Sequence, residues 1–212
     1  MIVNIRGGLG MQLLEAFSGL EPLEREPDAI HINTGGLSPH LCHDYLTPLF
    51  DTDIPILKVM GNAKQGAFNF NGFVRARRFV ERHKLNVETR DKNLPEVLHL
   101  RKMDRQIMSD EMFEAIQQQC PTYYPVQSFE EATLDQTIHD WKTFLAADSI
   151  VGPLSTFTLS TLLFDPNKSI FLFQEEDQNG PHRAPPEAFN TIRMLISEQV
   201  FPNLQWFPRV NV

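Results

Sequence analysis

The chain has 212 residues, of which 42% are hydrophobic and 10% aromatic, a composition typical of a globular protein. A chain of this length should bury roughly 70% of its unfolded surface, so a core can form without disulfides or metals. The formal net charge of -8 argues against a general binder of nucleic acid or anionic membranes.

The sequence predicts a cytoplasmic protein with no membrane span. No stretch approaches the ~20 apolar residues that a span needs, and residues 1–6 are too short and too soon polar for a signal segment. Cys42 and Cys120 are typical of free thiols in a reducing compartment.

The first 90 residues alternate between strand and helix patterns. Apolar and β-branched runs predict strands at residues 2–6, 28–33, 54–60 and 68–73. Helical spacing of apolar residues predicts helices at residues 12–20 and 74–84. The stretch 34–52 is rich in Gly, Pro, His and Asp, and we expect a long loop there.

The same alternation continues after a polar connector at residues 87–95. Strands are expected at residues 96–101, 123–126, 149–151 and 169–173, and helices at 109–120, 129–147, 155–164 and 186–201. Strands that alternate with helices imply parallel sheets with crossover helices. We therefore predict an α/β fold with two Rossmann-like lobes around a cleft, an N-terminal lobe at 1–90 and a C-terminal lobe at 91–212.

The first chemical motif is Gly7-Gly8-Leu9-Gly10, between a strand and a helix. Leu13 stands where a dinucleotide fingerprint needs a third glycine, and the Gly-Lys-Ser/Thr of a P-loop is absent. What remains is a glycine turn at a helix N-terminus, which lets a ligand approach the backbone and favours negative charge. Gly8, Leu9 and Gly10 are candidate binding residues, and a tight turn without a ligand is the alternative.

The second motif is at residues 99–105, where a predicted strand ends. Ligands of open α/β sheets bind at that end. His99 and Arg101 alternate with Leu100, so we expect both on one face. Arg101 could hold a diphosphate bidentately, and His99 could bond a base or phosphate. A charged, solvated strand end is the alternative.

The third motif is at residues 148–159, where an apolar strand leads into a hydroxyl-rich helix start. Ser155, Thr156 and the backbone N–H groups at Phe157 would suit phosphate oxygens. An ordinary helix cap is the alternative interpretation of this motif.

Taken in order, these motifs resemble the α-1,2-, α-1,6- and protein O-fucosyltransferases. Residues 7–12 resemble their Gly-Gly-Leu-Gly-Asn-Gln opening, and residues 97–104 their His-X-Arg-Arg-X-Asp segment. Residues 149–163 resemble their third motif, and residues 70–76 a Gly-Tyr-Phe-Gln-Ser stretch of the α-1,2 group. Asp140 precedes Ser155 by fifteen residues, as does the guanine-reading aspartate of the α-1,6 relatives.

The resemblance implies an inverting, metal-independent glycosyltransferase of compact GT-B-like arrangement. It implies a GDP-sugar donor with fucose as the expected sugar, no cofactor, and a glycan or another small hydroxyl compound as acceptor. Arg101 would hold the β-phosphate, Asp140 and His99 the guanosine, and the first glycine loop would face the donor from the acceptor-side lobe. Asp110 and Glu111 lie near the glutamate of the α-1,6 relatives and are candidate bases.

Other interpretations stay open. Met11 replaces the usual Asn and the first lobe is short, so a non-catalytic binding module that kept the fold is the main alternative. A Rossmann-type oxidoreductase lacks its third glycine. Residues 40–44 are metal-like but have no second spaced pair, so an ordinary loop is expected. The basic residues of 75–84 would form a solvated face, line the donor cleft, or contact an acidic acceptor.

Overall fold

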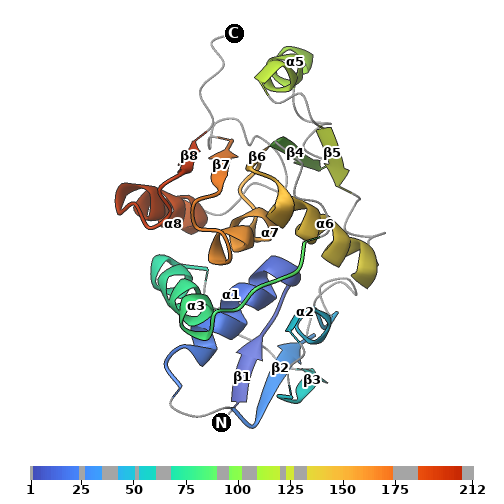
Figure 1. The fold of residues 1–212 in the computed structure, drawn as a ribbon, viewed down its shortest axis with the longest axis vertical. Helices are drawn as coiled ribbons and strands as arrows, with labels where there is room; N and C mark the ends of the chain where they lie inside the picture. Colours follow the sequence, from blue (N-terminus) through green and yellow to red (C-terminus); the bar gives the residue numbers. More distant parts are fainter. Residues whose placement is uncertain are drawn as a thin grey trace.

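The computed structural model describes residues 2–23, 27–34, 43–50, 53–60, 68–89, 96–101, 109–119, 123–126, 133–173 and 186–206. The protein has an α/β fold built on parallel sheets, as the sequence predicts (Figure 1). One sheet has three strands and the other five, and every strand pair in both is parallel.

The three-stranded sheet is formed by the first part of the chain, in the order β1-β2-β3. Its strands are β1 (Ile2–Ile5), β2 (Ala29–Asn33) and β3 (Ile56–Val59). Burial alternates along β1, where Val3 and Ile5 are buried and Ile2 and Asn4 are exposed. One face of the sheet therefore packs against helix α1 (Leu9–Leu20), as the period of a half-buried strand requires.

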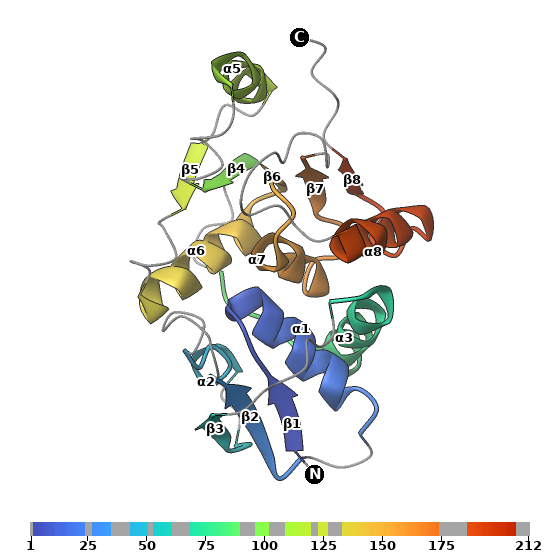
Figure 2. The ribbon, with the colours of Figure 1, turned by 180° about the vertical axis from the view of Figure 1, so that it is seen from behind.

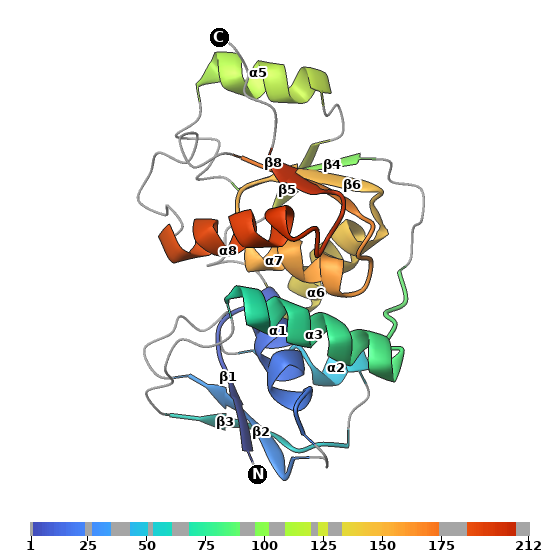
Figure 3. The same cartoon turned by 90° about the vertical axis from the view of Figure 1, so that its left-hand side faces the viewer.

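The five-stranded sheet has the order β5-β4-β6-β7-β8. Its strands are β4 (Glu96–Arg101), β5 (Tyr123–Val126), β6 (Ser149–Gly152), β7 (Ser169–Leu172) and β8 (Leu204–Trp206). Helices α6 (Leu134–Ala146), α7 (Thr156–Leu159) and α8 (Pro186–Ser197) lie on the face toward the smaller sheet. Helix α5 (Asp110–Gln119) lies on the other face (Figure 3).

Aromatic rings join the helices of the two sheets. Phe17 of α1 stacks on Phe79 of α3 (Phe70–His83), with 5.3 Å between ring centroids, and meets Phe164 edge-on at 6.1 Å. Phe164 follows the short helix η2 (Ser160–Leu163) and also meets Trp141 of α6 edge-on at 5.5 Å. The helices of both sheets therefore share one apolar core.

An arginine adds a polar link across the same boundary. One guanidinium nitrogen of Arg77, in α3, donates a hydrogen bond to the carbonyl oxygen of Leu163 at 2.9 Å. The other terminal nitrogen pairs with Glu81 one turn along the helix, at 2.5 Å. Arg77 therefore satisfies a carbonyl at the end of η2 while a carboxylate balances its charge.

The predicted strand at 68–73 is wrong, because most of this segment is the start of α3. The Asn69 side chain accepts a hydrogen bond from the backbone N–H of Gly72 at 2.9 Å and caps the helix. Phe73, Ala76 and Val80 are buried at helical spacing. The cap and this spacing together outweigh the β-propensity of the phenylalanines.

The predicted long loop at 34–52 contains a short helix, α2 (Thr47–Phe50). Asp44 starts it, since its carboxylate accepts hydrogen bonds from the backbone N–H groups of Leu46 and Thr47. Within the predicted helix at 155–164, α7 gives way to the 3-10 helix η2 after Leu159. The predicted closing helix at 186–201 ends at Ser197, and strand β8 follows where the sequence predicts none.

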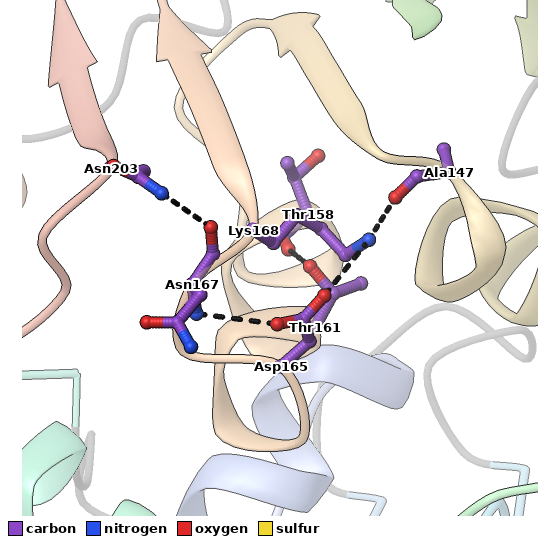
Figure 4. A network of polar contacts seen from close by, with 7 residues as sticks. All are labelled: Ala147, Thr158, Thr161, Asp165, Asn167, Lys168 and Asn203. Carbon is purple, nitrogen blue, oxygen red and sulfur yellow. Dashed lines mark hydrogen bonds and ion pairs between the residues drawn. The ribbon is translucent and has the colours of Figure 1, made fainter. Parts of the chain in front are cut away.

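Lys168 is a buried cation at the amino end of β7, with 3% of its surface exposed (Figure 4). Its ammonium group donates to the carbonyl oxygen of Ala147, at the C-terminus of α6, and lies 3.6 Å from Asp165. Nearby, Asn203 donates to the Asn167 carbonyl at 2.6 Å. The network connects the end of α6 to the starts of β7 and β8. A cation at the C-terminus of a helix is stabilised by the helix dipole and by the last carbonyl groups.

Lys168 makes stability depend on pH. Burial lowers the pKa of its ammonium group below the ordinary 10.5, although Asp165 and Asp148 oppose the shift. Between the lowered pKa and 10.5 the unfolded chain binds more protons here than the folded chain, so stability rises with pH. We expect urea unfolding from about pH 7.5 to about pH 10 to favour the wild type increasingly over Lys168→Met.

The exposed Lys58 provides the control, because Lys58→Met removes a lysine that is not buried. The difference between wild type and Lys58→Met should change less over the same pH range, because burial is the cause of the effect at Lys168. A constant difference for Lys168→Met would contradict the pH dependence assigned to Lys168.

Candidate functional site

The order of the five-stranded sheet creates a topological switch point between β4 and β6. The chain builds β4 first, places β5 on one side of it, and then crosses to place β6 on the other. Helices α5 and α6, which make these two crossings, lie on opposite faces of the sheet (Figure 3). Open α/β sheets bind their ligands outside the carboxyl ends of the strands at such a point.

The second and third motifs flank this switch point. Leu98 of β4 pairs with Val151 of β6, and β4 continues beyond this pair to His99 and Arg101. Strand β6 ends at Gly152, and the chain then enters α7. His99 and Arg101 therefore lie at the carboxyl end of β4, and Ser155 comes shortly after the carboxyl end of β6, the edge where ligands of this fold class bind.

Ser155 is the N-cap of α7, and its hydroxyl oxygen accepts a hydrogen bond from the backbone N–H of Phe157 at 3.2 Å. In this structure Ser155 therefore acts as an ordinary helix cap, which is the alternative interpretation of the third motif. A hydroxyl that accepts through one lone pair still has its hydrogen to donate. Thr156 and Phe157 are half-buried, and the Phe157 ring meets Phe144 of α6 edge-on at 5.4 Å.

The glycine motif lies directly against the third motif. A Cβ placed on Gly10 would lie 2.1 Å from the carbonyl oxygen of Thr156, closer than any side chain tolerates. Gly10 is therefore a glycine that lets the first turn of α1 touch the first turn of α7 (Figure 2). Gly8 precedes the helix as its N-cap, and Leu9 is buried.

Gln12 holds the glycine turn in place. Its side chain is fully buried, and its amide nitrogen donates to the carbonyl oxygens of Gly7 at 2.9 Å and His43 at 2.7 Å. Its amide oxygen accepts from the backbone N–H of Tyr45 at 3.4 Å. From the sequence Gln12 is only a member of the motif without a role, because the burial of an amide inside an apolar helix leaves no signal in a single sequence.

Asp140 is buried on α6, with 4% of its surface exposed. Its carboxylate accepts a hydrogen bond from the side-chain amide of Gln136 at 2.5 Å, one turn earlier. Buried carboxylates need such partners. The structure thus gives Asp140 a contact within its own helix, and its predicted contact with guanine stays a prediction.

Asp110 and Glu111 are exposed in the first turn of α5. The five-stranded sheet lies between this helix and the contact of α1 with α7 (Figures 1 and 3). Acidic residues stabilise a helix N-terminus, which accounts for their position without any catalytic role. The structure therefore does not bring the two candidate bases to the glycine motif.

Three searches give no relative that could identify the site. No protein-family model matches the sequence, no curated protein matches it, and no solved structure matches the fold. Within the described ranges, no helix is long and apolar enough to cross a membrane. Cys42, Cys120 and most of the predicted metal-like segment at 40–44 lie outside the described residues.

The contact at Gly10 predicts a stability defect. Gly10→Ala should lower the free energy of unfolding by about 3 kcal/mol, because the new methyl group meets backbone that cannot move without shifting α7. Urea denaturation would measure the loss. Helix propensity alone predicts the opposite, a gain of about 1 kcal/mol.

Gly19→Ala, in the same helix, is the matched control. Its methyl group would lie nearest to the Val3 side chain, with one methyl at 2.9 Å, and a side chain gives way more easily than backbone, so we expect a loss of about 1 kcal/mol or less. Equal effects of the two substitutions would contradict the importance of the Thr156 contact.

Proposed function

We propose that the chain is a GDP-sugar-dependent glycosyltransferase whose donor binds at the switch point between β4 and β6. The observation that carries the proposal is topological: of the two motifs that resemble donor-binding segments, one begins in the last residues of β4 and the other contains β6, and these two strands flank this point. Arg101 ends β4 and Ser155 comes three residues after the end of β6, so two residues 54 positions apart in the chain come at the carboxyl ends of neighbouring strands.

The diphosphate would be held by groups from three segments. Arg101 would form a bidentate pair with the β-phosphate, and the hydroxyl of Ser155 would donate to a phosphate oxygen beside Thr156 and Phe157. The first turn of α1, at Leu9 and Gly10, would add the positive end of its helix dipole. The guanosine would lie toward His99, with Asp140 as its predicted reader.

In the proposed reaction an acceptor hydroxyl oxygen attacks the anomeric carbon of the sugar, and the bond from that carbon to the diphosphate breaks. GDP leaves with the electron pair, and the hydroxyl proton passes to a base. Without a metal, Arg101 and Ser155 would stabilise the charge that develops on the leaving diphosphate. One well-placed donor of this kind is worth about 3 kcal/mol in the transition state.

The proposal includes a GT-B-like arrangement and a cytoplasmic location. The smaller sheet would be the acceptor-side lobe and the larger sheet the donor lobe, with the acceptor a glycan or another hydroxyl compound. The shared aromatic core makes this arrangement compact, since it leaves the helices of both sheets in direct contact.

A binding module without transferase activity is the second candidate. The observation that favours it is the contact at Gly10, where backbone of α7 occupies the place that a ligand would need to reach the glycine. Met11 supplies no polar group to replace the missing Asn. This candidate predicts GDP binding without donor hydrolysis or transfer, so an assay for fucose release from GDP-fucose separates the two.

The donor assignment predicts nucleotide preference. In titration calorimetry with a chelator present, GDP should bind more tightly than UDP or ADP, because the proposed contacts read guanosine and need no metal. We expect a Kd below about 100 μM for GDP and at least about tenfold weaker binding of UDP and ADP. Tenfold corresponds to about 1.4 kcal/mol, which hydrogen bonds to the guanine base can supply. Equal binding of all three, or none, would overturn the assignment.

Arg101→Ala should weaken GDP binding by about ten- to a hundredfold, the loss of a charge-assisted contact worth roughly 1.5–3 kcal/mol. Arg101→Lys should recover only part, because an ammonium lacks the planar fork. GMP has no β-phosphate, so it should bind wild type and variant almost equally, whereas a misfolded variant would lose GMP too. Unchanged GDP affinity would show that Arg101 is a solvated strand end.

A further inference from the structure

Helix α3 carries a row of exposed arginines, formed by Arg75, Arg78 and Arg82. Their spacing of three and four residues places them on one side of the helix. The opposite side is buried in the core through Gly72, Phe73, Ala76 and Val80. Helix α3 lies in front of α1 in Figure 3, and all three arginines of the row are exposed to solvent.

Contacts within the protein do not explain why all three arginines of the row are there. Arg82 pairs with Glu21 at 2.7 Å, and the neighbouring Arg77 bonds Leu163 and Glu81 instead of joining the row. In the part of the chain that the structure describes, neither Arg75 nor Arg78 forms an ion pair. Like charges three and four residues apart destabilise a helix, so the row weakens α3.

We propose that the arginine row is a docking surface for a short acidic segment of a partner protein. The row spans about 10 Å along the helix axis, since seven residues rise 1.5 Å each. An extended peptide repeats its side chains on one face about every 7 Å, so two carboxylates fit this length. Arginine holds a carboxylate through two parallel hydrogen bonds, which lysine cannot do.

The charge of the rest of the protein selects this partner over longer polyanions. The net charge is -8, although the outer face of α3 is basic. Electrostatic interactions at physiological salt decay over about 8 Å, so a short segment senses mainly the arginine row. A nucleic acid duplex or an anionic membrane extends beyond it and meets the acidic remainder of the surface, which repels it.

Fluorescence anisotropy with a fluorescein-labelled hexaglutamate peptide tests the proposal on the full chain at physiological salt, where charges far from the arginine row are screened. Arg75→Gln/Arg78→Gln should weaken binding by about five- to tenfold, as two exposed ion pairs would. Lys58→Gln/Arg193→Gln is the matched control, because it removes the same charge from exposed positions on β3 and α8. The control should weaken binding less than about twofold.

Thermal unfolding supplies the second readout. A merely structural role of the arginines predicts a lower Tm for Arg75→Gln/Arg78→Gln, whereas docking predicts an unchanged or higher Tm because repulsion within α3 is relieved. Equal loss of peptide binding in the control, no binding of the peptide by the wild type, or tighter binding of a short DNA duplex than of the peptide would each overturn the proposal. None of these outcomes depends on donor binding.

Discussion

The contact between the first turns of α1 and α7 is the constraint on which the arrangement of the two sheets depends. At Gly10 the backbone of one helix lies against the backbone of the other, with no room for even one methyl group. Phe17, Phe79 and Phe164 extend the same boundary as an aromatic core. A close-packed interface of this kind has few alternative arrangements, so it fixes how the helices of one sheet sit on those of the other.

This constraint also sets the geometry of the candidate site. Because α7 is tied to α1, the loop that follows β6 is held next to the glycine turn, and Gln12 fixes that turn from within. The edge of the larger sheet at its switch point is thus bordered by a rigid element of the smaller one. For the proposed transfer reaction, preorganised groups of this kind would stabilise developing charge well, because they need not reorganise during the reaction.

Helix α3 shows how one element serves two surfaces. Its inner side and Arg77 bind it to the core and to the end of η2, whereas its outer side presents the arginine row. The inner contacts explain the apolar residues and one of the arginines. The exposed arginines need a different explanation, and a local basic surface on an acidic protein is suited to recognise a short acidic segment.

Much of the fold was predictable from the sequence, because the alternation of buried strands and amphipathic helices is a local pattern. The α/β class, the parallel sheets and the positions of most elements follow from it. The local pattern gave a wrong prediction at 68–73, where the phenylalanines favour a strand. The helix cap by Asn69 makes this segment the start of α3 instead. The missed strand β8 is three residues long and, among the residues that the structure describes, pairs with β7 alone, so little in the local sequence marks it.

For the candidate site, too, some features follow from the local sequence and others only from the tertiary structure. The sequence by itself determined which residues are chemically suited to bind a phosphorylated ligand, since the glycine turn, the arginine at a strand end and the hydroxyl-rich helix start are local features. Only the tertiary structure decided which of them meet. It paired Gly10 with Thr156, buried Asp140 beside Gln136 and placed Asp110 and Glu111 across the sheet. Strand order and helix packing join residues far apart in the chain, and no local pattern encodes those distances.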